Sequence, residues 1–481
     1  MRTSLIRAGS ALAAALLLFG MTAGACAGPP AGDERSPVNV VFVLTDDLSA
    51  NLVQYMPNVR ALAQDGTTFS QYTVTDSLCC PSRSSILTGR YPHNTGVFTN
   101  SGDDGGFHVF QREQERDTFA TSLRSRGYRT AMMGKYLNGY QPGEHGVRPG
   151  WTEWDVAGGG YGEYNYNLNE NGAVRHYGQA PEDYLTTVVE GKAESFITAS
   201  AEAGEPFLLE VATFTPHGPY VPAPEDKQAF PGLKAPRGPS FDKLPSDAPD
   251  WLAGRAPLTA AQTAQLDTAY RKRAQSVLSI DRMIGNLRQT LEKAGVADRT
   301  VVVFSSDNGF HLGEHRLTAG KQTAFDHDVH VPLVVAGPGV RGGATVEAPV
   351  LNIDLRPTFE QFGGVTPGPA VDGRSLLPWL RDGQAPGWRT TGLVEHHGPG
   401  QAADDPDRQA PAGGTPPTYA ALRGPDFTYV EYEGGAREYY DRTTDPEELL
   451  NTAAKLPAAR ATELHEKLES LRGCRGAEGC G

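Results

Sequence analysis

The sequence predicts an α/β fold in which a large, mostly parallel sheet is flanked by helices. Short, nearly unbroken apolar runs at residues 37–44, 207–214 and 300–304 alternate with helical patterns, and each run is followed by polar residues. Such runs are typical of parallel strands that are buried on both faces. Ligands of these sheets bind outside the carboxyl ends of the strands, so the polar residues that follow each run are the candidates for function.

The helices that connect these strands are marked by their end residues. Pro57 stands near the start of the first helical pattern, Gly66 follows its end, and Gly127 ends the second. The remaining elements expected before the C-terminal part are a helix at residues 57–64, a helix at 117–126, a strand at 129–133 and a helix at 260–294. The Pro-rich stretch at 222–257 is expected to be a surface excursion.

The C-terminal part has a different pattern and predicts a smaller α+β domain at residues 373–481, after a larger domain at 36–372. The elements expected in it are short strands at residues 390–396, 418–432 and 438–441, and a helix at 456–471. Between the first two lies a segment rich in Gly, Pro and Ala, residues 397–417, which we expect to be a mobile loop.

The N-terminus is predicted to be a signal peptide, residues 1–27. Arg2 and Arg7 precede a short apolar run, and small residues follow it. The run is too short to span a bilayer. Cys26 resembles the cysteine of a bacterial lipoprotein cleavage site, although the usual Leu is absent; ordinary Ala-x-Ala cleavage is the alternative. Both predict export, to free secretion or to the outer cell surface, with membrane contact only through a lipid at Cys26.

The composition limits the partners. Apolar residues make up 39% and charged residues 21%, as in soluble globular proteins. The formal net charge of -14 argues against nucleic acid as a partner. It leaves an anionic substrate open, because a bound cation and a few Arg or Lys side chains can reverse the local field.

The five cysteines have different expected fates. Cys26 is removed or lipidated on export. Cys474 and Cys480 are candidates for a small disulfide in an oxidising compartment. Cys79 and Cys80 are adjacent and are not expected to bridge each other.

Cys79 begins the most specific motif of the chain. Residues 79–90 read Cys-x-Pro-Ser-Arg followed by Leu-Thr-Gly-Arg. An isolated cysteine pair before a helix is an ordinary structural feature, but the complete pattern indicates chemistry at Cys79.

Two strand ends carry a candidate cation site. Asp46 and Asp47 follow the first apolar run, and Asp307 and Asn308 follow the last. Four hard oxygen donors on neighbouring strand ends suit Ca²⁺ or Mg²⁺ and not zinc, which favours His and Cys. A solvated acidic turn is the alternative for each pair taken alone.

The chain resembles the formylglycine-dependent sulfatases, whose fold is related to that of alkaline phosphatase. The resemblance rests on motifs that occur in the family's order: residues 46–47, 79–90, 134–136, 216–217, 307–321, 372–375, 438–441 and 445–448. It covers most of the chain after the signal peptide and identifies the larger domain as the catalytic one.

The resemblance implies a mechanism. A formylglycine-generating enzyme would oxidise Cys79 to an aldehyde, whose hydrate would attack the sulfur of a sulfate ester. The residues implied to hold one Ca²⁺ are Asp46, Asp47, Cys79 in its modified form, Asp307 and Asn308. Arg83 would steady the nucleophile. Lys135, His217 and Lys321 would surround the sulfate, with His217 or Lys321 protonating the departing alcohol.

The sequence departs from the common pattern at one point. Many sulfatases have Gly-Lys-Trp-His where residues 134–138 read Gly-Lys-Tyr-Leu-Asn. Asn138 cannot replace a histidine as a base. The variant is similar to the N-acetylglucosamine-6-sulfatase branch, which implies a sulfated carbohydrate of the glucosamine-6-sulfate type; an aryl sulfate is the other option.

Other interpretations remain. A phosphonate or phosphodiester hydrolase shares the fold and the aldehyde, and a cell-surface binding protein could retain an unconverted Cys79. A zinc phosphatase is disfavoured, because paired histidines are few. His311 and His315 are expected to shape the pocket, and residues 326–330 are expected to be structural.

Overall fold

The computed structural model describes residues 37–398, 405 and 408–481. The predicted signal peptide and part of the predicted loop at 397–417 lie outside these residues. Within the described part of the chain, no helix has the length and apolar character needed to cross a membrane.

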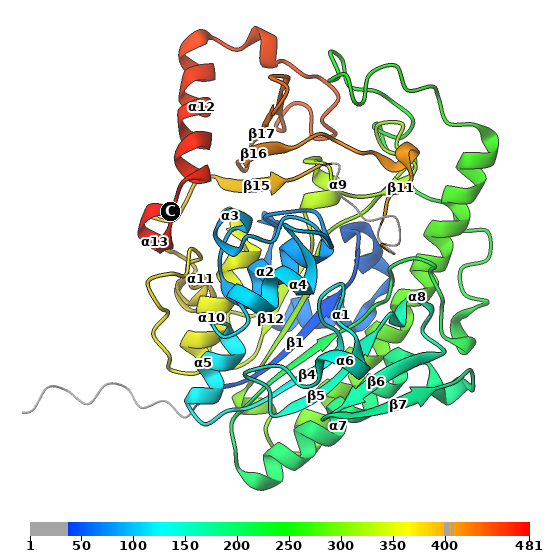
Figure 1. The fold of residues 1–481 in the computed structure, drawn as a ribbon, viewed down its shortest axis with the longest axis vertical. Helices are drawn as coiled ribbons and strands as arrows, with labels where there is room; N and C mark the ends of the chain where they lie inside the picture. Colours follow the sequence, from blue (N-terminus) through cyan, green and yellow to red (C-terminus); the bar gives the residue numbers. More distant parts are fainter. Residues whose placement is uncertain (1–36, 399–404, 406–407) are drawn as a thin grey trace, which may run out of the picture. The chain divides into compact units, whose positions relative to one another are not determined.

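A ten-stranded mixed sheet forms the centre of the structure, as predicted (Figure 1). Its strands, in spatial order, are β13 (Ala344–Val346), β2 (Thr67–Phe69), β12 (Leu333–Ala336), β9 (Thr300–Ser306), β1 (Asn39–Thr45), β8 (Phe207–Ala212), β4 (Arg129–Lys135), β5 (Glu153–Gly158), β6 (Tyr166–Glu170) and β7 (Ala173–Tyr177). The five consecutive strands from β9 to β5 are parallel. Their carboxyl ends therefore lie along one edge.

Strand β1 shows why an unbroken apolar run is needed. All of its residues are buried. Val40 and Phe42 pack into the core on one face of the sheet, and Val41 and Val43 pack into the core on the other. Since successive side chains of a strand point to opposite faces, both sets must be apolar when both faces are covered.

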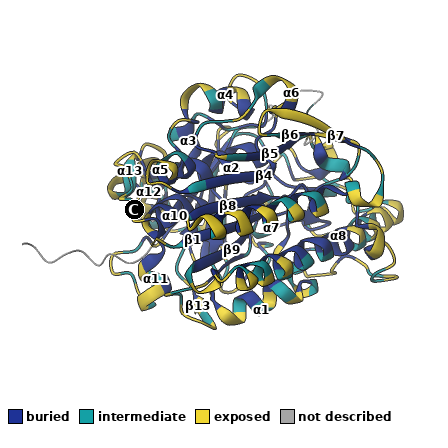
Figure 2. Ribbon diagram, turned by 90° about the horizontal axis from the view of Figure 1, so that it is seen from below, coloured by how far each residue is buried: buried dark blue, intermediate teal, exposed yellow. Residues whose placement is uncertain are grey.

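Helices cover the two faces of the central sheet. Figure 2 shows the buried strands between helices whose outer sides are exposed. On one face are α1 (Pro57–Asp65), α7 (Leu185–Ala203) and α8 (Ala260–Lys293); on the other are α2 (Cys79–Thr88), α5 (Phe119–Ser125) and α10 (Leu355–Phe362). Helix α8 also fixes the start of α1, because the carboxylate of Asp281 accepts hydrogen bonds from the backbone N–H groups of Asn58 and Val59.

The C-terminal part forms a separate antiparallel sheet, which confirms the predicted α+β character. It has the order β15 (Gly392–His396), β16 (Tyr419–Arg423), β17 (Phe427–Tyr432) and β18 (Arg437–Asp441), and α12 (Ala458–Arg472) packs on it. The stretch predicted as one strand region at 418–432 is two strands joined by a turn. The domain boundary near Gly373 remains a prediction.

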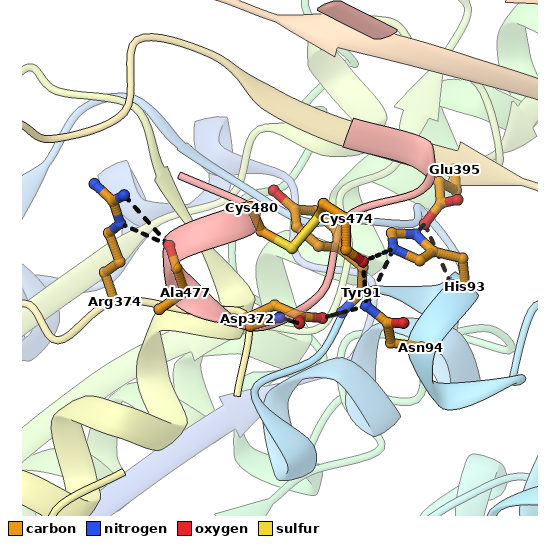
Figure 3. Close-up of a disulfide and its surroundings, with 10 residues drawn as sticks. Tyr91, His93, Asn94, Asp372, Arg374, Glu395, Cys474, Ala477 and Cys480 are labelled. Atoms are coloured by element: carbon orange, nitrogen blue, oxygen red, sulfur yellow. Dashed lines mark hydrogen bonds and ion pairs between the residues drawn. A yellow bond between two sulfur atoms is a disulfide. The ribbon is translucent and has the colours of Figure 1, made fainter. Parts of the chain in front are cut away.

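The predicted disulfide between Cys474 and Cys480 is present (Figure 3). The loop closed by this disulfide contacts α3 (Pro92–Thr95). The carbonyl of Cys474 accepts a hydrogen bond of 2.9 Å from the side-chain amide of Asn94 and lies 3.0 Å from Nε2 of His93. The carboxylate of Asp372 accepts from the N–H of Gly476. The C-terminus is thus tied to the segment that follows the Cys79 motif.

Elements between residues 153 and 203 are absent from the sequence-based prediction. Strand β7 is exposed at four of its five positions, and β6 pairs antiparallel with β5 and β7. A strand at an exposed sheet margin needs no apolar run, so the pattern used to find the central strands does not reveal it.

Gly134 in β4 allows the close approach of β8. Its φ is +95°, and a Cβ there would lie 2.0 Å from the carbonyl oxygen of Ala212.

We expect Gly134→Ala to lower the free energy of unfolding by about 3 kcal/mol or more, because backbone strain and a backbone clash add. The control is Gly127→Ala, where φ is +85° but no atom lies within 4 Å. It should cost only about 1 kcal/mol in chemical denaturation. Equal losses in the two variants would contradict the role of the clash.

Candidate active site

The predicted site residues meet at the carboxyl edge of the parallel strands. β1 is followed by Asp46 and Asp47, β9 by Asp307 and Asn308, and β4 ends at Lys135. His217 lies on the segment after β8, Cys79 is the first residue of α2, and Lys321 follows β11 (Ala319–Gly320). All of these side chains are buried.

Asp46 connects the cysteine to the first lysine. Its carboxylate lies 2.5 Å from Nζ of Lys135 and 3.4 Å from Sγ of Cys79. Burial raises the pKa of Asp46 to about 6, against the opposing attraction of Lys135. Further positive charge at this point therefore favours the ionised carboxylate.

Asp47 collects three other groups of the site. Its Oδ1 accepts hydrogen bonds from Nζ of Lys321 at 2.6 Å and from the side-chain amide of Asn308 at 2.7 Å. Its Oδ2 lies 3.5 Å from Nε2 of His217. Asp47 has a φ of +62°, the left-handed conformation, which is uncommon for a residue other than glycine.

The two adjacent cysteines have different surroundings. Sγ of Cys79 is 2.9 Å from Nζ of Lys321 and faces the carboxylates. Sγ of Cys80 instead accepts a hydrogen bond of 3.0 Å from the backbone N–H of Asn138. The geometry thus singles out Cys79 as the thiol that faces the cluster.

Arg83 joins α2 to the carboxylates. Its Nε lies 2.8 Å from Oδ2 of Asp307, and it donates to the carbonyl of Lys135. Burial opposes the charge on Arg83, but attraction to Asp307 and Asp46 outweighs it and holds the pKa of the guanidinium above its usual value. The Arg83 guanidinium therefore stays protonated, and its contacts with Asp307 and Lys135 fix its position.

The donor set fits a hard divalent cation. One ligand atom from each of Asp46, Asp47, Cys79 and His217 lies within 4.8 Å of the others. Oδ1 of Asn308 is buried without a hydrogen-bond partner, so this oxygen has a lone pair available to a cation. Carboxylate and amide oxygens are the ligands that Ca²⁺ prefers. His217 was predicted as a sulfate contact and not as part of this group.

Both oxygens of Asp307, the remaining predicted ligand, are engaged in protein contacts. Oδ2 pairs with Arg83, and Oδ1 accepts from the backbone N–H groups of Asp47 and Asn308. These contacts fix the carboxylate in position beside the group.

A cavity of about 250 Å³ adjoins the cluster, and its lining includes Tyr161, a residue that the sequence motifs do not predict. Lys135, Asn138, Tyr161 and Phe214 are among its lining residues. The ring of Tyr161 lies 4.8 Å from Nζ of Lys135 and 4.7 Å from the His217 ring. The hydroxyl of Tyr161 accepts a hydrogen bond of 3.2 Å from the side-chain amide of Asn138. Tyr161 lies in the short 3-10 helix η2 (Gly160–Gly162), between β5 and β6, and belongs to no motif, so its sequence gives no signal.

His311 and His315, the two histidines expected to shape the pocket, each have partners of their own. His311 lies 2.9 Å from Asp328 through Nδ1 and 2.8 Å from the Gly413 carbonyl through Nε2. His315 is fully buried and stacks on Phe325, and burial holds its pKa well below the usual value. Asp326 pairs with Arg423 and Arg442, away from the carboxylate group.

Known proteins show the same organisation. The Sulfatase family model matches residues 38–365, and the model described as N-sulphoglucosamine sulphohydrolase, C-terminal, matches residues 313–473. N-acetylglucosamine-6-sulfatase of Homo sapiens is 35% identical over 497 residues, which cover 97% of this chain and 88% of that protein.

Solved structures share the fold. BT4656 in complex with its substrate D-glucosamine-2-N,6-O-disulfate has a TM-score of 0.75 at 24% identity and covers 90% of this chain and 97% of its own. The phosphonate monoester hydrolase of Agrobacterium radiobacter has a TM-score of 0.70 at 24% identity, with 90% and 95% covered. The family model and the 35% identical human relative show that the chain belongs to the sulfatase family and is a sulfuric ester hydrolase.

Proposed function

We propose that this enzyme hydrolyses the 6-sulfate of a glucosamine-type sugar, using a formylglycine made from Cys79 and one Ca²⁺. The observation that carries the proposal is the position of Cys79 between Nζ of Lys321 at 2.9 Å and the carboxylate of Asp46 at 3.4 Å. The 35% identity to N-acetylglucosamine-6-sulfatase over 97% of the chain supports the substrate class.

Four residues would hold the cation: Asp46, Asp47, Asn308 and Asp307. When present, the hydrated aldehyde supplies the nucleophile and Ca²⁺ supplies Lewis-acid stabilisation of charge. The protein's own cations complete the site. Lys135 pairs with Asp46 and Lys321 pairs with Asp47, and from there both would bind the sulfate oxygens and offset charge as the ester bond breaks.

Two groups are candidates for protonating the departing alcohol. Lys321 contacts Cys79 directly, on the side of the nucleophile. The ring of His217 contacts Tyr161, which lines the cavity, so His217 is closer to where a sugar would lie. Asn138 donates from its side-chain amide to the hydroxyl of Tyr161, and this pair would contact the sugar.

The site would be matured and used outside the cytoplasm. Residues 1–27 are proposed to be the export signal. Ordinary cleavage would remove Cys26 with the signal, whereas on the lipoprotein route cleavage would precede Cys26 and leave it as the lipid-bearing residue. The Cys474–Cys480 disulfide agrees with an oxidising compartment. The proposed partners are a sulfated glycan and the formylglycine-generating enzyme.

Conversion of Cys79 is the first test. Peptide mass spectrometry across residues 77–83 should show a loss close to the mass of one water at Cys79 and none at Cys80. Cys79→Ala should lower kcat by about three orders of magnitude or more, because the nucleophile is lost. Cys80→Ala is the matched control and should retain most of the activity. A fully intact Cys79 thiol in active enzyme would falsify the formylglycine mechanism.

The reaction class is tested with esters of a single alcohol. We expect kcat/KM for N-acetylglucosamine-6-sulfate to exceed that for the phosphodiester of the same hydroxyl. Both esters carry one negative charge, but the phosphodiester has a second organic group in place of an oxygen that Lys135 or Lys321 would bind. The positional isomer with sulfate at another hydroxyl is the control for the sugar. Dominant turnover of the phosphodiester would support a phosphonate or phosphodiester hydrolase instead.

The proton donor is identified by leaving-group dependence. If His217 is the acid, His217→Ala should lower kcat/KM for the sugar sulfate by about 100-fold or more. The same variant should affect nitrophenyl sulfate far less, because nitrophenolate departs without a proton. Lys321→Ala should slow both substrates alike. The reverse pattern would assign the proton to Lys321.

A further inference from the structure

Arg273 of α8 is a buried cation next to the active site, and no motif assigns it a role. We propose that Arg273 is a positioning residue that holds the loops after β1, β8 and β9 in the arrangement that binds the cation. Its side chain is fully buried. The proposal rests on the cation site proposed above.

The guanidinium binds two of these loops through their backbone. Its Nη2 donates to the carbonyl of Asp47 and, at 3.1 Å, to the hydroxyl of Ser49. Its Nη1 lies 3.4 Å from the carbonyl of Pro216, directly before His217. One side chain therefore joins the loop that carries Asp47 to the loop that carries His217.

Aromatic contacts extend the connection to the third loop. The guanidinium carbon lies 4.4 Å from the ring centre of Phe310, which follows Asp307 and Asn308. It lies 5.7 Å from the ring of Tyr220 on the loop after β8. Cations over aromatic faces are attracted by the ring, so these contacts hold both loops against α8.

The conformation of Asp47 explains what the contact achieves. With a φ of +62°, its carbonyl points to Arg273 while its carboxylate contacts Asn308 and Lys321. A left-handed conformation is unfavourable for a residue other than glycine. A charged hydrogen bond to the carbonyl offsets this cost and keeps the carboxylate turned toward the site.

Among the described residues, the guanidinium has no carboxylate as a hydrogen-bond acceptor. The oxygens that accept from it there are the carbonyls of Asp47 and Pro216 and the hydroxyl of Ser49. Burial lowers the pKa of Arg273, which reflects the desolvation of its charge. Replacing such a group with an apolar side chain can leave stability unchanged or improve it. A loss of cation affinity in the variant is therefore separable from a loss of stability.

The test measures Ca²⁺ binding directly, by calorimetric titration of the full mature enzyme after removal of metal. Arg273→Met should weaken Ca²⁺ binding by about 10- to 100-fold, the usual effect of removing a group that orients metal ligands. It should lower kcat at saturating Ca²⁺ more than it changes KM. Arg273→Lys should recover part of the affinity, because it restores a donor to the Asp47 carbonyl.

The matched control is Arg423→Met. Arg423 of β16 is also a buried arginine, but it pairs with Glu448, which follows β18, and with Asp326 of α9 (Asp326–Val329). This variant should lower the melting temperature while its Ca²⁺ affinity stays within about twofold of the wild type, as for distant sites.

The outcomes separate the two proposals. Wild-type protein that binds no Ca²⁺ would overturn the proposed cation. Wild-type protein that binds Ca²⁺, with Arg273→Met binding it equally well, would overturn the role of Arg273. If Arg273→Met is insoluble, the same titration of Arg273→Lys decides, because unchanged affinity and kcat in that variant are incompatible with a geometric requirement for the guanidinium.

Discussion

The active site depends on a balance of buried charge at the carboxyl edge of β1 and β9. Asp46, Asp47 and Asp307 are all excluded from water there. Burial by itself raises the pKa of Asp46, so carboxylates this close require positive partners to remain ionised. Arg83 contacts Asp307 and Lys135 contacts Asp46. This arrangement of opposite charges suits the cation and the sulfate that we propose for the site.

Helix α2 and the C-terminal part both hold site residues in place at this edge. Helix α2 is buried along its whole length, and the hydroxyl of Ser82 donates to the carbonyl of Asp307. The helix that carries Cys79 is thereby fixed to the β9 loop. From the C-terminal part, the side chain of Gln409 bonds both the N–H and the carbonyl of Lys321, and the hydroxyl of Tyr419 donates to the carbonyl of Gln322. The C-terminal part thus holds Lys321 near Cys79.

The central part of the fold could be predicted because it is the most constrained. Strands buried on both faces, such as β1 and β9, must be apolar at every position, and that pattern is visible in the sequence. The elements from β5 to α7 were not predicted, since their patterns are set by partial exposure. The segment at 418–432 was recognised as β structure, but its division into β16 and β17 depends on a turn that pairs the two strands.

By itself, the sequence determined the reaction class of this protein, because the Cys79 motif and the aspartates at strand ends are those of sulfuric ester hydrolases. The same residues are the ones we propose as nucleophile precursor and cation ligands. Parallel strands end at one edge, so these residues had to meet there. Only the tertiary structure decided how they are held. Tyr161 and Arg273 approach the edge from a turn and from a distant helix, and their identities follow from local packing and backbone acceptors. Such contacts join residues far apart in the chain, and no local pattern encodes them.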